Sequence, residues 1–179
     1  MTNPFLSTMR MRRGQVIIEA MIALGVLTIG FLGVVTLLSR SLSLNRVVAD
    51  DYAATYLAAE GIEVVKNLID ANTIQGRPWG TDLSDGDYEL EYDTTFSASA
   101  PLGYNPNALV AYVGRAIRVD PATKIYSYRG SSPTSFTRRI RIANVTADEV
   151  QVNAIVRWTA RGGANSEINL EDHFFRWRP

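Results

Sequence analysis

A single carboxylate, Glu19, stands at the start of a long uncharged stretch of this chain. Three arginines precede it, and no Asp, Glu, Lys or Arg occurs from Ala20 to Ser39. A charged side chain deep in a bilayer costs roughly 2.5–3.5 kcal/mol, whereas each large apolar residue recovers about 0.3–0.6 kcal/mol. The large apolar residues from Ile22 to Leu38 outweigh that cost. We therefore expect the segment to insert into a membrane. Glu19 should lie near the membrane interface and should have a functional role there.

Enzymatic chemistry has little support elsewhere in the chain. His173 is the only histidine, and on an expected strand it shares a face with Glu171, with which it could pair. The chain contains no Gly-x-Ser-x-Gly nucleophile motif, no Gly-x-x-x-x-Gly-Lys phosphate loop and no cysteine. We expect no catalytic residue, no metal site and no cofactor, so a membrane-anchored enzyme is the least favoured function.

Two groups of charged residues have alternative interpretations. Asp82, Asp85 and Asp87 invite a calcium site, but their spacing is not that of a calcium loop and Asp-Gly favours a turn. A strip of arginines could contact the phosphates of a nucleic acid, although a net charge of zero and cross-strand pairing with Glu149 or Glu167 favour a structural role. This strip comprises Arg138, Arg139 and Arg141, with Arg115, Arg118 and Arg129 expected nearby. Asn144-Val145-Thr146 also fits the N-glycosylation pattern, which is a short and common match.

The uncharged run has about the length needed to span a hydrocarbon core near 30 Å thick. An ordinary secretory signal would have a shorter apolar region that ends at small residues, whereas this run is followed by Arg40. A plain membrane anchor is the other alternative. The arginines at the N-terminus place that end in the cytoplasm and the rest of the chain outside. Gly25, Gly30 and Gly33 would permit close helix packing, as glycines do in many membrane helices.

The stretch from Arg12 to Gly33 resembles the signature of type IV prepilins. That family has a short basic leader ending in Gly, a cut after this Gly, a Glu as the fifth residue of the mature chain, and a long apolar helix. Gly14, Gln15 and Glu19 match these positions, although most members begin with Phe or Met where this chain has Gln15. Residues 18–33 look most like minor pilins of the PilV type and related minor pseudopilins.

The resemblance implies an assembly pathway and its partners. A prepilin peptidase would cut between Gly14 and Gln15 and methylate the new amine. Glu19, buried among apolar helices, would pair with the N-terminal amine of a neighbouring subunit and so set the axial register. The other partners would be pilin or pseudopilin subunits, an inner-membrane assembly platform and membrane lipid. The chain would first be a single-pass inner-membrane protein and then part of an extracellular or periplasmic filament.

The remaining pattern predicts a helix followed by a sheet. From residue 40 to 70 there is no proline, and apolar residues recur on one helical face, while Glu60, Glu63, Asn67 and Asp70 lie away from it. The apolar face comprises Leu57, Ala58, Gly61, Ile62, Val65, Leu68 and Ile69. We therefore predict a leader over 1–14, a helix over 15–71 with its membrane span at about 18–39, and a sheet domain over 72–179.

The sheet domain is expected to be an antiparallel meander. Strands are predicted over 110–119, 124–128, 136–144, 149–159 and 167–177, with Ser131-Ser132-Pro133 as a break and Gly162-Gly163 as the last turn. Trp79 is expected to cap the sheet. The fold class is α+β and pilin-like, with the long helix packed on the sheet.

Three functions follow from this architecture. The first is a structural minor pilin or pseudopilin of a type IV pilus or of a type II secretion-like filament. The second is a tip-located adhesin or a module that binds DNA or a substrate through loops 72–87 and 97–107. The third is the anchored enzyme. The sequence does not distinguish a pilus from a secretion or competence system.

Overall fold

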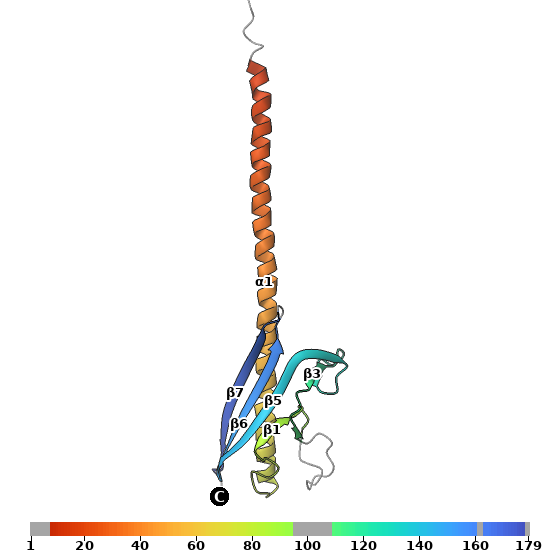
Figure 1. The fold of residues 1–179 in the computed structure, drawn as a ribbon, viewed down its shortest axis with the longest axis vertical. Helices are drawn as coiled ribbons and strands as arrows, with labels where there is room; N and C mark the ends of the chain where they lie inside the picture. Colours follow the sequence, from red (N-terminus) through yellow and green to blue (C-terminus); the bar gives the residue numbers. More distant parts are fainter. Residues whose placement is uncertain (1–7, 95–108, 161–162, 178–179) are drawn as a thin grey trace, which may run out of the picture. The chain divides into compact units, whose positions relative to one another are not determined.

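The computed structural model describes residues 8–94, 109–160 and 163–177. One long helix, α1 (Thr8–Ile74), precedes seven strands, and the chain divides into two compact units, Met1–Val48 and Ala49–Pro179. The strands are β1 (Gly86–Glu89), β2 (Val110–Ala111), β3 (Ala116–Val119), β4 (Tyr126–Ser127), β5 (Ser132–Thr146), β6 (Glu149–Thr159) and β7 (Asn165–Phe175). The fold is therefore α+β (Figure 1). The helix predicted over 15–71 is longer at both ends.

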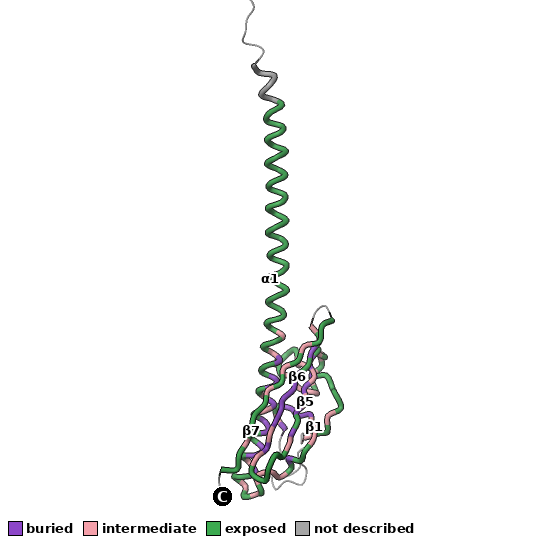
Figure 2. Tube along the Cα trace, turned by 60° about the vertical axis from the view of Figure 1, so that its left-hand side comes forward, coloured by how far each residue is buried: buried purple, intermediate pink, exposed green. Residues whose placement is uncertain are grey.

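The second unit holds the hydrophobic core, which forms between the C-terminal part of α1 and the sheet. The predicted apolar face of the helix is buried, except that Ile62 is only partly buried, and Ala54 and Val64 join it. The sheet contributes Ile140, Ile142, Val150, Val152, Ala154 and Val156, all at most 1 % exposed. Burial of apolar surface on one face of the helix explains why this segment is ordered against the sheet (Figure 2).

Gly61 marks the place where helix and sheet approach most closely. A Cβ atom at this position would lie 2.6 Å from Cδ1 of Ile140 and 3.4 Å from Cβ of Ala154. Such a separation is below any normal carbon–carbon contact, so only glycine fits without a shift of the core. Glycine has a low helix propensity and so weakens the interior of α1. At position 61 the close packing of the sheet nevertheless favours it over any residue with a Cβ atom.

The sheet is antiparallel but is a meander only in part. β5, β6 and β7 follow one another as hairpin-connected neighbours, with Val150, Val152 and Ala154 facing the core. The other edge of β5 is shared, since β1 pairs with residues 140–142 and β3 with residues 132–137. β2 then pairs with β1, and β4 with β3. The single meander predicted from the sequence is wrong for the strands before β5.

Two predicted strand boundaries also differ from the structure. The strand expected over 110–119 is divided into β2 and β3 at Gly114, which has φ +80° and so turns the chain. The break expected at Ser131-Ser132-Pro133 is wrong in part, because Ser131 precedes β5 but Ser132 and Pro133 belong to it, with Pro133 opposite Arg118 in the short strand β3. The last hairpin turns through Gly163 at φ +83°, while Gly162 lies outside the described residues.

A buried ion pair links the helix to the sheet. The guanidinium of Arg138 on β5 donates to Glu60 Oε1 at 2.8 Å, to the carbonyl of Leu57 at 2.9 Å and to the carbonyl of Leu90 at 2.6 Å. The side chain of Arg138 is 3 % exposed and that of Glu60 is 33 % exposed. The expectation that Glu60 lies away from the sheet is therefore wrong. Glu63 does lie on the outer side, paired with Lys66 at 3.8 Å.

Candidate functional site

The residues expected at the processing site all lie on α1. Gly14, Gln15 and Glu19 are exposed, and Gln15 and Glu19 are separated by one helical turn. Within the described part of the chain, no basic side chain forms an ion pair with Glu19. Glu19 is thus available to a group from another molecule.

The helix is apolar on every side after Glu19. The large hydrophobic residues from Val16 to Leu38 are exposed, most of them by more than half of their surface. α1 is the one helix among the described residues that is long and apolar enough to cross a membrane. Side chains of this kind need lipid or other apolar helices around them. The segment could therefore serve as a single-pass membrane anchor.

The small residues on the apolar segment have open surroundings, in contrast to Gly61. Apart from the adjacent residues and the helix's own nearby backbone, no heavy atom of the described residues lies within 4 Å of a Cβ built on Gly25, Gly30 or Gly33. Any packing role of these glycines therefore has to involve a different molecule.

The predicted arginine strip is neutralised within the sheet unit. Five acidic residues alternate along one segment, and most of them pair with arginines on neighbouring elements. These acidic residues are Asp85, Asp87, Glu89, Glu91 and Asp93, and we call them the acidic row. Arg139 and Arg141 bind Asp87, Arg115 binds Glu89, and Arg129 binds Glu91 and Asp93.

The predicted partners of this strip are wrong, because Glu149 pairs with His173 and Glu167 pairs with Arg157. Residues 49–179 carry 13 basic and 17 acidic side chains, a formal net charge of −4. Arg118 differs from the other arginines of the strip, because it donates to the carbonyls of Gly130 and Ser131.

The acidic row also fixes the loops that follow β2 and β4. Glu89, with a fully buried side chain, accepts from the amides of Val113 and Arg115 at 3.2 and 2.9 Å. Burial raises the pKa of Glu89, but these hydrogen bonds, with that from the Arg115 side chain, outweigh burial and lower the pKa below its ordinary value. Glu91 accepts from the amide of Tyr128 at 2.7 Å. Glu89 and Glu91 therefore anchor the loops after β2 and β4 at this edge of the sheet.

His173 is held between two carboxylates on the surface of β6 and β7. Nδ1 lies 2.7 Å from Glu149 and Nε2 lies 3.3 Å from Glu171, as the shared face predicts for Glu171. The bond to Glu149, and then that to Glu171, raises the pKa of His173 above its ordinary value. Both ring nitrogens of His173 are therefore engaged by carboxylates of β6 and β7.

The three aspartates proposed for calcium are dispersed among separate partners. Asp82 pairs with Arg77, Asp85 accepts from Asn144, and Asp87 pairs with Arg141. No group of ligating side chains that could hold a metal ion occurs in residues 8–94, 109–160 and 163–177. The Nδ2 of Asn144 donates to Leu83 and Asp85 at 2.9 and 2.7 Å, so the amide that would carry a glycan is already engaged.

Of the two loops predicted for binding, the structure describes 72–87 but not 97–107. Trp79 in the first loop packs against the core and donates from Nε1 to the carbonyl of Ala147 at 3.2 Å, as expected for a capping residue. The second loop, 97–107, lies outside the described residues.

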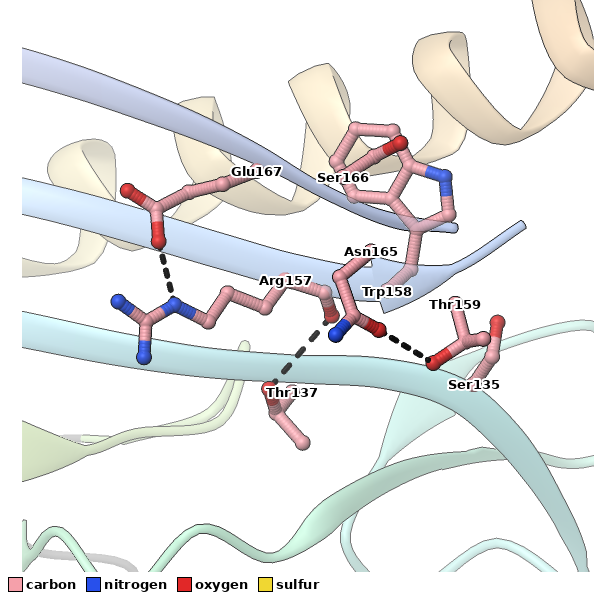
Figure 3. A pocket seen from close by; sticks show the side chains of 8 residues that line it. All are labelled: Ser135, Thr137, Arg157, Trp158, Thr159, Asn165, Ser166 and Glu167. Atoms are coloured by element: carbon pink, nitrogen blue, oxygen red, sulfur yellow. Dashed lines mark hydrogen bonds and ion pairs between the residues drawn. The ribbon is translucent and has the colours of Figure 1, made fainter. Parts of the chain in front are cut away.

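A shallow hollow of about 400 Å³ opens at one end of β5, β6 and β7 (Figure 3). Its polar groups already satisfy one another, since Arg157 binds Glu167 and Thr159 donates to Asn165 at 3.2 Å. Its lining contains no buried charge that awaits a ligand. The lining residues are Ser135, Thr137, Arg157, Trp158, Thr159, Asn165, Ser166 and Glu167.

Two features of the charged residues escaped the sequence argument. The acidic row has a visible signal, because acids recur at every second position from 85 to 93, as on one face of a strand. The Arg138–Glu60 pair has no such signal, since the two residues are 78 positions apart. Among the described residues, the apolar segment of α1 from Val16 to Leu38 is exposed. Comparisons with protein-family models, with curated proteins and with solved structures find no match to this chain.

Proposed function

We propose that this protein is a structural subunit of a type IV pilus or type II secretion-like filament, a minor pilin or pseudopilin. The observation that carries the proposal is that one helix joins a fully exposed apolar segment to an amphipathic segment packed on a sheet. A plain anchor needs only about 20 residues of helix. The resemblance of Gly14, Gln15 and Glu19 to the prepilin signature supplies the remaining support.

The role of Glu19 follows from the cost of burying a charge. When the subunit joins a filament, lipid around the apolar segment is replaced by other helices, and Glu19 then needs a cation close by. The amine created at Gln15 of a neighbouring subunit is such a cation. The pair sets the axial position of each subunit, because removing one partner strands a buried charge.

The first test is intact-mass and N-terminal analysis of the protein from native membranes, with and without the prepilin peptidase. A mature start at Gln15 in the presence of the peptidase, with or without one methyl group, supports the proposal. A start at Met1 in both strains refutes it and reduces the apolar segment to an anchor.

The second test separates assembly from processing. We expect Glu19→Ala to be cut normally but to be depleted from sheared filaments. The matched control is Glu63→Ala, which removes another exposed acid of the same helix, one that already pairs with Lys66. If Glu19→Ala enters filaments as well as the control does, the proposed role of Glu19 is wrong.

A further inference from the structure

Four polar side chains form a continuous network across the outer face of the β6–β7 hairpin. Nδ2 of Asn153 on β6 donates to Oε2 of Glu171 on β7 at 2.8 Å, and Oε1 of Glu171 lies 3.3 Å from Nε2 of His173. Nδ1 of His173 in turn lies 2.7 Å from Glu149, the first residue of β6. We call these four residues the hairpin network. It connects the middle of the hairpin, where Asn153 is opposite Glu171, to its end, where Glu149 is opposite Phe175.

The other charged side chains around this end of the sheet have contacts of their own. These are Asp172, which accepts from the backbone amide of His173 at 2.8 Å, Arg176, which pairs with Asp148 at 3.7 Å, and Arg141 on β5, which pairs with Asp87 at 2.9 Å. The residue opposite His173 on β6 is the uncharged Gln151. Among the described residues, Glu149 and Glu171 are thus the carboxylates within hydrogen-bonding distance of the imidazole ring.

A single proton decides whether both carboxylates can be bound. The charged imidazolium has an N–H group on each ring nitrogen and so donates to Glu149 and to Glu171 at once. The neutral ring has one N–H group and one lone pair. If both carboxylates stayed in place, the lone pair would face a negatively charged oxygen, which is repulsive. The neutral ring therefore keeps one carboxylate and releases the other.

The geometry determines which carboxylate is released. The contact of His173 with Glu149 is shorter than that with Glu171, 2.7 Å against 3.3 Å, and so is the stronger hydrogen bond. The side chain of Glu149 is 22 % exposed and that of Glu171 is 49 % exposed, so Glu171 turns to water at the lower cost. Glu171 also retains Asn153 as a donor. The neutral ring therefore carries its proton on Nδ1.

We infer that His173 is a one-proton switch in the β6–β7 hairpin, whose protonated ring joins Glu171 to Glu149 and whose neutral ring, protonated on Nδ1, keeps Glu149 and releases Glu171. Loss of the proton thus divides the hairpin network between Glu171 and His173. The end of β7 is then held less firmly, including the exposed Phe175, whose ring stacks on His173 with a centroid separation of 6.4 Å. The inference does not depend on the proposed filament function, because all of these groups belong to the sheet unit.

The electrostatics of the two partners set the pH range. The hydrogen bond to Glu149, and then that to Glu171, raises the pKa of His173, so the network is joined at low pH and is divided above the ordinary pKa of histidine. Hydrogen bonds, first that from Asn153, lower the pKa of Glu171. Glu171 therefore stays charged while His173 loses its proton.

The first test reads the protonated nitrogen of His173 directly. The full chain, without a histidine tag, is labelled with ¹⁵N-histidine and studied by NMR in detergent. His173 is the only histidine, so the spectrum contains one imidazole. Above the titration midpoint we expect the proton on Nδ1 and the large downfield shift of an unprotonated nitrogen on Nε2.

Two variants test which carboxylate holds the neutral ring. Glu149→Gln should move the proton to Nε2, because Glu171 is then the remaining carboxylate. Glu171→Gln should leave the proton on Nδ1. A proton on Nε2 in the unsubstituted chain, or on Nδ1 in Glu149→Gln, overturns the inference.

The second test measures the effect on the hairpin by amide hydrogen exchange of the C-terminal peptide. The protection factors of residues 173–175 should fall several-fold as pH rises through the titration midpoint of His173. Glu171→Gln should remove this step, because the ring then meets only one carboxylate in either form. Glu167→Gln is the matched control, since Glu167 lies on the same face of β7 but pairs with Arg157, and the step should persist. A step that is absent from the unsubstituted chain, or unchanged in Glu171→Gln, overturns the link between the proton and the hairpin.

Discussion

Removal of Glu60, a partly exposed acid on α1, should destabilise the protein more than removal of the buried arginine that it binds. Arg138 is 3 % exposed, and its Nε is buried without a hydrogen-bond partner in the described part of the chain. The guanidinium is thus incompletely compensated even with Glu60 present. In Glu60→Ala the guanidinium remains in the core, and its acceptors among the described residues are then the carbonyl groups of Leu57 and Leu90.

The two single substitutions have different expected costs. Breaking a buried ion pair by removal of one partner costs about 3–5 kcal/mol when a buried charge is left behind. Arg138→Met leaves no buried charge, because Glu60 reaches solvent, and its main cost is the unsatisfied carbonyl of Leu90, about 1–3 kcal/mol. The double substitution should therefore be more stable than Glu60→Ala alone.

The assay is urea unfolding of residues 49–179, which contain the whole core, followed by tryptophan fluorescence. Glu63→Ala is the matched control, since its pair with Lys66 is exposed and should change the free energy of unfolding by less than about 0.5 kcal/mol. The reasoning is refuted if Arg138→Met is the less stable single variant, or if adding it to Glu60→Ala lowers stability further.

Three further predictions concern packing, backbone strain and pH. Gly61→Val should lower the free energy of unfolding by about 1–3 kcal/mol through overpacking, whereas Gly30→Val, with open surroundings, should leave unfolding of the full chain in detergent unchanged. Lys124→Gly should raise the free energy of unfolding by about 0.5–1 kcal/mol, because Lys124 has φ +61°, a conformation that glycine adopts without strain. The pKa of Glu89 is lower in the folded protein than in the unfolded chain. The Glu89 carboxylate therefore contributes to the free energy of unfolding above its unfolded pKa, and this contribution is lost as pH falls through the folded pKa. The pKa of His173 is higher in the folded protein than in the unfolded chain. His173 therefore contributes to the free energy of unfolding below its unfolded pKa, and this contribution is lost as pH rises through the folded pKa. In a plot of the free energy of unfolding against pH, Glu89→Gln should flatten the acidic limb and His173→Gln should flatten the neutral limb. An unchanged limb in either variant would contradict the role assigned to that residue.

Local patterns predicted the elements whose determinants are local. The helix follows from the lack of proline and the apolar face around Leu57 and Val65, and β6 has the predicted bounds because its side chains alternate. The sharing of β5 by β1 and β3 could not be predicted, since pairing between distant strands leaves no local signal.

The candidate site divides in the same way. Gly14, Gln15 and Glu19 are found from a spacing within one helix, and their roles in processing and assembly stay predictions. The predicted arginine strip is correct only in part, because Arg138 is buried against α1 whereas Arg139 and Arg141 pair with Asp87. Its partners were not predicted, because the acidic row reaches it through tertiary contacts such as Arg141–Asp87. The pairing of Glu171 with His173 was predictable, since it needs only the alternation of one strand.

The last strand of the sheet has a consequence for aggregation. Among the described strands β7 pairs only with β6, so one edge of it presents free backbone groups. Asp172 lies opposite Val152 and hence on the inward face of β7, between Leu170 and Phe174. A foreign strand added to this edge would have to bury that carboxylate, which disfavours edge-to-edge aggregation. The free edge of β7 is thereby protected against pairing with the sheet of a second molecule.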